Sequence, residues 1–444
     1  RDCLRMGSED FTIRTAMLEH RFVCGDLELA SELNEKLWRN LFEGTAKEFI
    51  SAKLKERENR HEKHGQRYMV EPNVKEGKGG LRDLQSLYWI AKYVYKTQNI
   101  SDLVELNVFR SDEQEQFDKA EEFLWAVRCQ MHHLSDRAIE QLSFDLQVEV
   151  ATAMGYKDSK ARRGVEIFMQ DYFRHATRVG DLTRIFLTSL EAVHAKDEPL
   201  LERIFKRRPK IGDEYAVIHN RLAIKSEQKF LKNSINLLKL FSEALRTGLL
   251  IHPNAMRLVS ANLSSIDKEF RQSPEAQTIF LELLLKHGNP ERALRRMNEL
   301  GFLAKFIPEF EPIVAMMQFN MYHSYTVDEH TIQCLKTLAQ IEKGELVEEL
   351  PIASSILKNG VNRKVIYVAL LLHDIGKGRS EDHSILGAKI AKQVSPRLGL
   401  KKQETETVEW LVRYHLLMSD MAQKRDISDP RTVRDFAKAV QSVK

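Results

Sequence analysis

The sequence has few cysteines and no long apolar run. Cys3, Cys24, Cys129 and Cys334 are scattered without a CxxC pair, which argues against a disulfide framework and a cysteine-rich zinc module. Isolated thiols of this kind are typical of the reducing cytoplasm, where we expect the protein to work. The longest uncharged apolar run is near Val365–Leu372, far shorter than a membrane span, so we expect no membrane association.

The sequence also lacks a charge imbalance. It has 68 Lys plus Arg against 64 Asp plus Glu, a formal net charge of +4, and the two signs are interspersed. No basic footprint for nucleic acid is present, so we expect no nucleic-acid partner. A length of 444 residues with 43% hydrophobic residues predicts a globular protein of two or three domains. The start at Arg1 rather than Met suggests a segment of a longer protein.

Helical periodicity dominates, so we expect a mainly α fold. Leu29, Leu33, Leu37 and Leu41 recur every four residues and form one apolar stripe on a helix. The charged stretch 53–67 reads as a solvated helix end or a linker.

Two further segments have well-marked boundaries. EYAVIHNRLAIKSE predicts a small β-hairpin, because short apolar strands flank His219 and Asn220. NPERALRRMNELGF predicts a helix with Asn289 as its cap, Pro290 in its first turn and Gly301 past its end.

The stretch ALLLHDIGKG carries the strongest chemical signal. An apolar run that reads as a buried helix ends on His373 and Asp374, with Gly376 suited to end the helix. Upstream, Thr326 and Glu329 predict a capping box, so a helix should start at Val327 with His330 in its first turns and on the same face as Cys334.

An ionised Asp at the end of a buried helix is costly unless a cation accompanies it. One reading of the histidines around Asp374 is a hydrogen-bonded polar network in the core. The other is a divalent metal site, which we favour because four histidines and a neighbouring Asp lie on or beside inward-facing helices within 86 residues, 330–415. Imidazole with carboxylate is a usual ligand mixture for Mn, Fe or Zn and, with fewer histidines, for Mg.

His330, the pair His373-Asp374 and a later Asp, all on helices, resemble the HD superfamily of metal-dependent phosphohydrolases, and HDIGKG is one of its most recognisable forms. The resemblance implies that His330, His373 and Asp374 hold the metal. Asp374 is then also a catalytic residue. Lys377, one turn beyond the pair, is placed to add positive charge in catalysis, although a surface lysine after a glycine is the commoner case.

Further ligands follow from the same resemblance. His383 and His415 resemble the extra ligands of members that hold two metals. Asp426 completes the set, with Asp429 as the alternative, because both match the pattern RDxxDP and one of them can cap a helix starting near Pro430. The divalent ion is expected to be Mg or Mn, with Fe or Zn as alternatives.

The stretch VEPNVKEGKGGLRDLQSLYWIAKY offers a second candidate site. Its glycines allow backbone amides to turn inward just before a helix that starts near Leu81, a reasonable place for an anion. Lys75, Lys78, Gly79 and Gly80 are therefore candidate nucleotide- or phosphate-binding residues. The alternative is a tight turn with solvated lysines, and the physical reasoning leaves both open.

By pattern this stretch is similar to the bacterial bifunctional PII uridylyltransferase/uridylyl-removing enzymes, and so are DFTIRTAMLEHRFVCGD, RCQMHHLSDRAIEQLSFDLQVEVATAMGY and YHSYTVDEHT. The resemblance implies the tail of a nucleotidyltransferase helical region at 1–150, a mostly helical connector at 151–303 and an all-α HD domain at 304–444. It implies the PII signalling protein, UMP and UTP as partners and glutamine as an effector.

In that family a Gly-Ser motif followed by carboxylates attaches UMP to PII, and we expect these motifs to lie outside this chain. The expected activity is therefore hydrolysis of PII tyrosyl-O-UMP alone. Two alternatives remain: an HD phosphohydrolase acting on a small nucleotide, and a non-catalytic module that binds a metal or a nucleotide.

Overall fold

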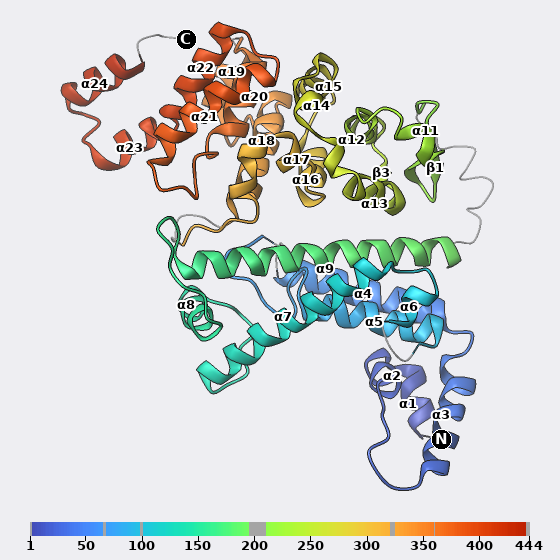
Figure 1. The fold of residues 1–444 in the computed structure, drawn as a ribbon. Coiled ribbons are helices and arrows are strands. Elements are labelled where there is room, and N and C mark those ends of the chain that lie inside the picture. Colours follow the sequence, from blue (N-terminus) through green and yellow to red (C-terminus); the bar gives the residue numbers. More distant parts are fainter. Residues whose placement is uncertain are drawn as a thin grey trace. The chain divides into compact units, whose positions relative to one another are not determined.

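The fold is mainly helical, with one small sheet, as predicted (Figure 1). The computed structural model describes residues 2–64, 68–97, 101–194, 210–319, 325–358 and 360–440. None of the helices in these ranges has the length and apolar character needed to cross a bilayer.

Two compact units make up the chain. The first unit comprises Arg1–Ser159, Arg163–Arg208 and Met317–Tyr325. The second unit comprises Lys160–Arg162, Pro209–Met316 and Thr326–Lys444.

The first unit is built from helices in its described part. They are α1 (Asp2–Glu9), α2 (Phe11–Leu18), α3 (Leu27–Leu37), the π-helix η1 (Trp38–Phe42), α4 (Ala46–His64), α5 (Leu81–Tyr95), α6 (Asp102–Glu105), α7 (Ser111–Ser135), α8 (Phe144–Ala153) and α9 (Gly164–His194).

The predicted leucine stripe is split between two helices. Leu37 and Leu41 are buried, but Leu29 is 64% exposed and Leu33 47% exposed in the described structure. The regular α-helix ends at Leu37 and the chain continues as η1. The four-residue spacing therefore predicted the helix correctly but not the burial of its first half.

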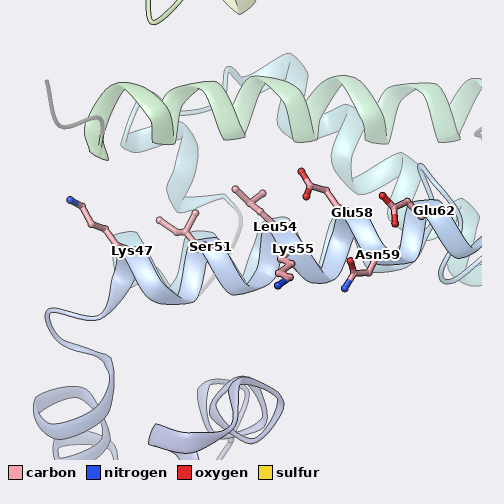
Figure 2. A pocket seen from close by; sticks show the side chains of 8 residues that line it. Lys47, Ser51, Leu54, Lys55, Glu58, Asn59 and Glu62 are labelled. Atoms are coloured by element: carbon pink, nitrogen blue, oxygen red, sulfur yellow. The ribbon is translucent and has the colours of Figure 1, made fainter. Parts of the chain in front are cut away.

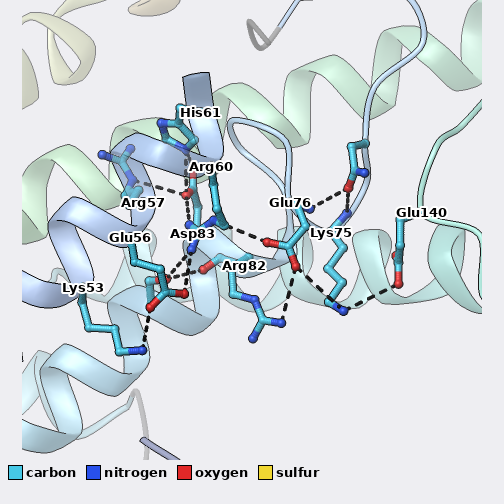
Figure 3. A network of polar contacts seen from close by, with 12 residues as sticks. Lys53, Glu56, Arg57, Arg60, His61, Lys75, Glu76, Arg82, Asp83 and Glu140 are labelled. Carbon is cyan, nitrogen blue, oxygen red and sulfur yellow. Dashed lines mark hydrogen bonds and ion pairs between the residues drawn. The ribbon is translucent and has the colours of Figure 1, made fainter. Parts of the chain in front are cut away.

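The charged stretch after the stripe is only partly solvated in its described part: Lys55, Glu58, Asn59, Glu62 and Lys63 are exposed, whereas the opposite face packs against the rest of the unit. Basic side chains of α4 converge on Asp83, a fully buried residue in the first turn of α5 (Figure 3). The Asp83 carboxylate lies 3.0 Å from both Arg60 and His61 and 3.3 Å from Arg57, and it accepts the amide of Gly79 at 2.9 Å. This network joins α4 to α5, and residues 65–67 lie outside the described structure.

The charge of Asp83 is stabilised by its partners. Burial works to raise its pKa, but the hydrogen bond from His61 and the charges of Arg57 and His61 hold that pKa well below the usual range of an aspartate. The carboxylate therefore stays ionised in the interior.

The second unit contains the sheet and the remaining described helices. Its elements are β1 (Tyr215–Ile218), β2 (Arg221–Ile224), α11 (Glu227–Phe230), α12 (Asn236–Thr247), β3 (Leu250–Ile251), α13 (Pro253–Ala261), η2 (Leu263–Ser265), α14 (Lys268–Gln272), α15 (Pro274–Leu285), α16 (Glu291–Glu299), α17 (Phe302–Phe306), η3 (Pro308–Ile313), α18 (Val327–Lys343), α19 (Pro351–Lys358), α20 (Arg363–Leu372), α21 (His383–Arg397), α22 (Lys402–Arg413), α23 (Leu417–Lys424) and α24 (Pro430–Val440).

The predicted hairpin is present. β1 pairs antiparallel with β2, and the turn residues His219 and Asn220 both have positive φ, of 45° and 58°, as a two-residue hairpin turn with matching twist requires. Strand β3 adds to β2 in parallel, which the sequence did not indicate.

One apolar core runs through the second unit. It contains Tyr215 of the hairpin, Phe302 of α17, Leu372 of α20 and Val412 of α22. The boundary predicted at residue 303 lies inside this unit, because residues on both sides of it contribute to the same core. The metal-site residues predicted from the sequence all lie on its C-terminal helices or in the loops that follow them.

We expect Asp83→Asn to destabilise the first unit by about 3 kcal/mol, because Arg57, Arg60 and His61 would keep a buried positive charge without its carboxylate. Since the pKa of Asp83 is lowered in the folded chain, its contribution is complete above the unfolded value of about 3.9 and is lost as the pH falls below it. The difference between variant and parent should therefore shrink in acid.

Urea unfolding followed by tryptophan fluorescence measures this loss. In a Trp410→Phe background the remaining tryptophans, Trp38, Trp89 and Trp125, all belong to the first unit. Asp112→Asn is the matched control, since Asp112 is exposed and pairs only across the surface with Arg110. Equal stability of the two variants at neutral pH would contradict the role given to Asp83.

Candidate metal centre

Four helices of the second unit carry the predicted metal ligands. His330 lies in the first turns of α18, and His373 and Asp374 directly follow α20. His383 is the first residue of α21, and His415 lies in the turn after α22. The ligands therefore sit at helix ends that the apolar core brings together.

Buried polar contacts anchor the start of α18. Glu329 forms a two-point ion pair with Arg295 of α16, at 2.5 and 3.2 Å, and Asp328 accepts from Asn298 and from the amide of Ala315. Helix α18 begins at Val327 as predicted, but the capping box is wrong: the Thr326 side chain makes no capping bond, and Glu329 turns to Arg295 instead. These contacts fix the helix turn that presents His330.

A close backbone contact places His383. A Cβ added to Gly376 would lie 2.1 Å from the carbonyl oxygen of His383 and 2.7 Å from the amide of Gly387. Only glycine lets the turn after α20 meet the start of α21 at this separation. The sequence assigned Gly376 to ending a helix, whereas in the structure it also brings His383 beside the His373-Asp374 turn.

The structure forms two neighbouring groups of possible ligands among the described residues. One consists of His330, Cys334 and His373, and the other of Asp374, His383 and His415; within each group the ligand atoms lie within 4.8 Å of one another. Ring centroids are 5.4 Å apart for His330 and His373, 5.4 Å for His373 and His415, and 5.6 Å for His383 and His415. Five of the six predicted ligands are thus brought together.

Two of the imidazoles are held in a fixed tautomer. Nδ1 of His373 donates to the carbonyl oxygen of Leu370 at 2.7 Å, and Nδ1 of His415 donates to that of Val412 at 2.8 Å. Since a carbonyl oxygen only accepts, each Nδ1 carries a proton, and Nε2 is the nitrogen left to bind a metal or, when it is protonated, to donate to Asp374. This is the usual arrangement of a metal-binding histidine.

Asp374 belongs to the second group and also contacts His373 of the first. One carboxylate oxygen is 3.2 Å from Nε2 of His373 and 2.8 Å from Nζ of Lys377, and the other is 3.6 Å from Nε2 of His415. Burial works to raise its pKa, but the hydrogen bond and charge of His373 and the charge of Lys377 hold the pKa of Asp374 far below its usual range. Lys377 itself is only 6% exposed, so it is not the surface lysine that is commonest after a glycine.

Two neighbouring groups also have shifted pKa values. Burial lowers the pKa of His415 and outweighs the hydrogen bond to Val412 and the charge of Asp374, which raise it, so the neutral imidazole is favoured near pH 7. Burial and the charge of Asp374 raise the pKa of the Cys334 thiol to about 11. A metal ion binds the neutral form of an imidazole.

The donor set fits a divalent cation. Four imidazoles, a buried carboxylate and one thiol lie close together, and the Nδ1 hydrogen bonds of His373 and His415 leave Nε2 of each ring toward Asp374. Without a metal, these Nε2 atoms need protons to face the carboxylate favourably, and burial disfavours the charged form of His415. An ion would take the place of these protons, and its charge would balance that of the carboxylate.

The sixth predicted ligand lies apart from these groups. Asp426 is exposed, accepts from the amide and hydroxyl of Ser428, and belongs to neither group among the described residues. Asp429 accepts the amide of Arg431 at the start of α24, which is a capping contact. The choice of Asp426 as a ligand stays a prediction.

The glycine-rich turn before α5 is the other predicted site. Its amides have acceptors inside the turn: those of Lys75 and Glu76 donate to the Asn73 side chain, and that of Gly79 donates to Asp83. The Gly80 amide likewise donates to the carbonyl of Gly77. The amides that were expected to hold an anion are thus used by the fold.

The two lysines of this turn differ in their surroundings. Lys75 is 3.8 Å from both Glu76 and Glu140, and Lys78 is exposed. Phosphate binding here stays a prediction that depends on the lysine side chains rather than on the backbone.

A pocket of about 530 Å³ lies along α4 in the same unit (Figure 2). Its lining includes Lys47 and Lys55 together with Glu58 and Glu62, so the charges balance and the surface mixes polar with apolar groups. Nothing in this lining forms a nucleophile with a base or a set of metal ligands.

Cys334 and the anchors of α18 are the functional features that sequence reasoning missed. The spacing of four residues between His330 and Cys334 did place both on one helix face, which was the available signal. The pairing of Glu329 with Arg295 had no local signal, because the partners are 34 residues apart on different helices.

Comparison with known families agrees with the resemblance drawn from the motifs. Residues 48–187 match the family described as GlnD PII-uridylyltransferase, residues 215–306 match the third domain of the uridylyltransferase GlnD, and residues 327–442 match the HD domain. The last match covers all the predicted metal ligands.

Curated relatives extend this similarity over the whole chain. Proteins named bifunctional uridylyltransferase/uridylyl-removing enzyme are 70% identical in Ruegeria pomeroyi, 66% in Cereibacter sphaeroides and 48% in Azospirillum brasilense, over 99–100% of this chain. The chain spans about half the length of these relatives, 48–49%. The chain therefore belongs to the GlnD family of bifunctional uridylyltransferase/uridylyl-removing enzymes.

Proposed function

We propose that this chain hydrolyses the phosphodiester that joins UMP to a tyrosine of the PII signalling protein and releases UMP and unmodified PII. The HD match at residues 327–442 and the uridylyl-removing activity in the names of the relatives support this reaction. The observation that carries the proposal is the convergence of two ligand groups on the buried carboxylate of Asp374.

We propose the following roles for the residues. His330 and His373 hold one side of the centre, His383 and His415 hold the other, and Asp374 lies between them with an oxygen toward each side. A divalent ion bound there would supply an activated water and positive charge for the phosphoryl oxygens. Mg²⁺, Mn²⁺, Fe²⁺ and Zn²⁺ are the ions to compare.

Lys377 has a double role in this proposal. Its ammonium lies 2.8 Å from Asp374 and stabilises the carboxylate in its ionised form. Its position one turn after the ligand pair also brings a positive charge toward negative charge that grows on the phosphoryl group, which is the kind of preorganised stabilisation that accelerates phosphoryl transfer.

The tyrosine leaving group needs little assistance from a general acid. In the proposed step water oxygen forms a bond to phosphorus, the bond between phosphorus and the tyrosine oxygen breaks, and the proton from water ends on the phenol. A phenol has a pKa of about 10, so its anion leaves more readily than an alkoxide. A strong general acid is therefore not required of the residues described.

We propose removal of UMP as the activity of this chain by itself. Gly7 and Ser8, which resemble a transferase Gly-Ser motif only in composition, lie within helix α1 rather than on a strand that presents carboxylates. UTP, UMP, PII and a glutamine signal are the ligands and partners that the family resemblance implies for the longer protein, and the cytoplasm is the compartment that the free thiols favour.

Asp374→Asn should abolish release of UMP from uridylylated PII, because the amide keeps the size of the side chain but removes its charge. Replacing His373 and Asp374 together by Ala should have the same effect. The measurement is UMP release by the full chain, with circular dichroism to show that helix content is kept.

His133→Ala is the matched control, since His133 is an exposed histidine of α7 in the other unit. It should release UMP at the parental rate. Hydrolysis retained by the folded Asp374→Asn variant would reject the proposed function.

Lys377→Met should lower kcat for UMP release by about 10²-fold, the usual cost of losing one preorganised charge-stabilising donor. The methionine keeps the length of the side chain in its buried position. The metal content of the variant decides how the lysine acts: unchanged content with reduced kcat supports a role toward the phosphoryl group, whereas metal loss in proportion to activity would show that Lys377 only supports Asp374.

A further inference from the structure

Cys334 is the one cysteine that lies among the metal-site residues. It follows His330 by one helical turn on α18, and its sulfur is 3.6 Å from Nε2 and 3.9 Å from Nδ1 of that imidazole. With His373 these two residues form a group whose ligand atoms lie within 4.8 Å of one another. The other three cysteines are exposed.

The surroundings of Cys334 are unusual for a thiol that only fills space. Leu335 and Leu338, its neighbours on α18, are buried and belong to the apolar core, whereas the Cys334 sulfur faces the nitrogens of His330. A packing thiol would be expected to meet carbon atoms. Here the sulfur contacts an imidazole that is itself a candidate ligand.

We propose that Cys334 is a metal ligand, and that the His330–Cys334–His373 position takes a thiophilic divalent ion such as Zn²⁺ or Fe²⁺ in preference to Mg²⁺. The inference rests on the metal-dependent function proposed above and specifies its metal. Sulfur with two imidazoles is a soft donor set, which suits Zn and Fe, whereas Mg prefers oxygen.

The two halves of the centre are then chemically different. The Asp374–His383–His415 position offers a carboxylate and two imidazoles and has no sulfur. Such a set suits Mn, Fe and Zn, and it accepts hard ions more readily than the sulfur position does. A centre of this kind binds its two ions with unequal selectivity, although both positions adjoin the same pair, His373-Asp374.

Cobalt absorption tests the proposal directly on the full chain. Co²⁺ bound by a thiolate has a charge-transfer band in the near ultraviolet, whereas Co²⁺ bound only by imidazole and carboxylate shows ligand-field bands without it. We expect the parent chain to show the charge-transfer band and Cys334→Ser to lose it while keeping ligand-field bands from the remaining ligands, which also shows that the variant is folded.

The matched control replaces the other three thiols: a Cys3→Ser/Cys24→Ser/Cys129→Ser chain should keep the band. Competition with zinc supplies a second readout. The affinity of the sulfur position for Zn²⁺ should fall at least about tenfold in Cys334→Ser, because loss of a group that only orients a ligand already costs about 10–100-fold in metal affinity. The affinity of the control chain should be unchanged.

The outcomes separate this inference from the proposed function. Cobalt ligand-field bands without a charge-transfer band in the parent chain, or a band that persists in Cys334→Ser, would overturn the role of Cys334 and leave the hydrolase proposal standing. A parent chain that binds no cobalt and yet hydrolyses uridylylated PII would overturn the metal-ligand role for all these residues. Loss of the band in Cys334→Ser alone, with the control intact, supports it.

Discussion

The second unit depends on how it accommodates one buried carboxylate. Asp374 directly follows an apolar helix, and its ionised form is stabilised in that place by His373 and Lys377. The starts of α18 and α21 and the turns after α20 and α22 meet here, and each supplies a side chain to one of the two ligand groups. The proposed metal site therefore uses the same side chains that already surround the buried carboxylate of Asp374.

The first unit also contains a buried ionised carboxylate, but different groups stabilise its charge. Asp83 is also fully buried, but its partners are the permanent cations of Arg57 and Arg60 together with His61, and its second oxygen accepts a backbone amide. Cationic side chains saturate that carboxylate and leave it structural. Asp374 instead faces Nε2 of two imidazoles whose Nδ1 protons are already used, and these nitrogens can exchange a proton for a metal ion.

The sequence predicted the ligand residues of the site better than the packing contacts that position them. The residue types and inward-facing helices around HDIGKG favoured a metal site, and the resemblance to the HD superfamily implied that His330, His373, Asp374, His383 and His415 would lie close together. The hairpin at His219-Asn220 was predictable because its residue types and strand pattern are local properties. The pairing of α4 with Asp83 and of Arg295 with Glu329 was not, since each depends on which helices pack together. The charged stretch 53–67 was predicted to be a solvated helix end or a linker, because a single sequence does not show a buried partner 20 or more residues away.

The glycine at position 376 has a mechanical consequence. Where a side chain separates two packed segments, its rotamers absorb small displacements, but here the turn after α20 meets the carbonyl of His383 and the amide of Gly387 with no side chain between them. A tilt of α21 is therefore transmitted to the imidazole of His383 and to the turn that carries Asp374 at once. A partner that binds α21 and α22 away from the ligands would therefore change the positions of His383 and Asp374 without contacting either side chain.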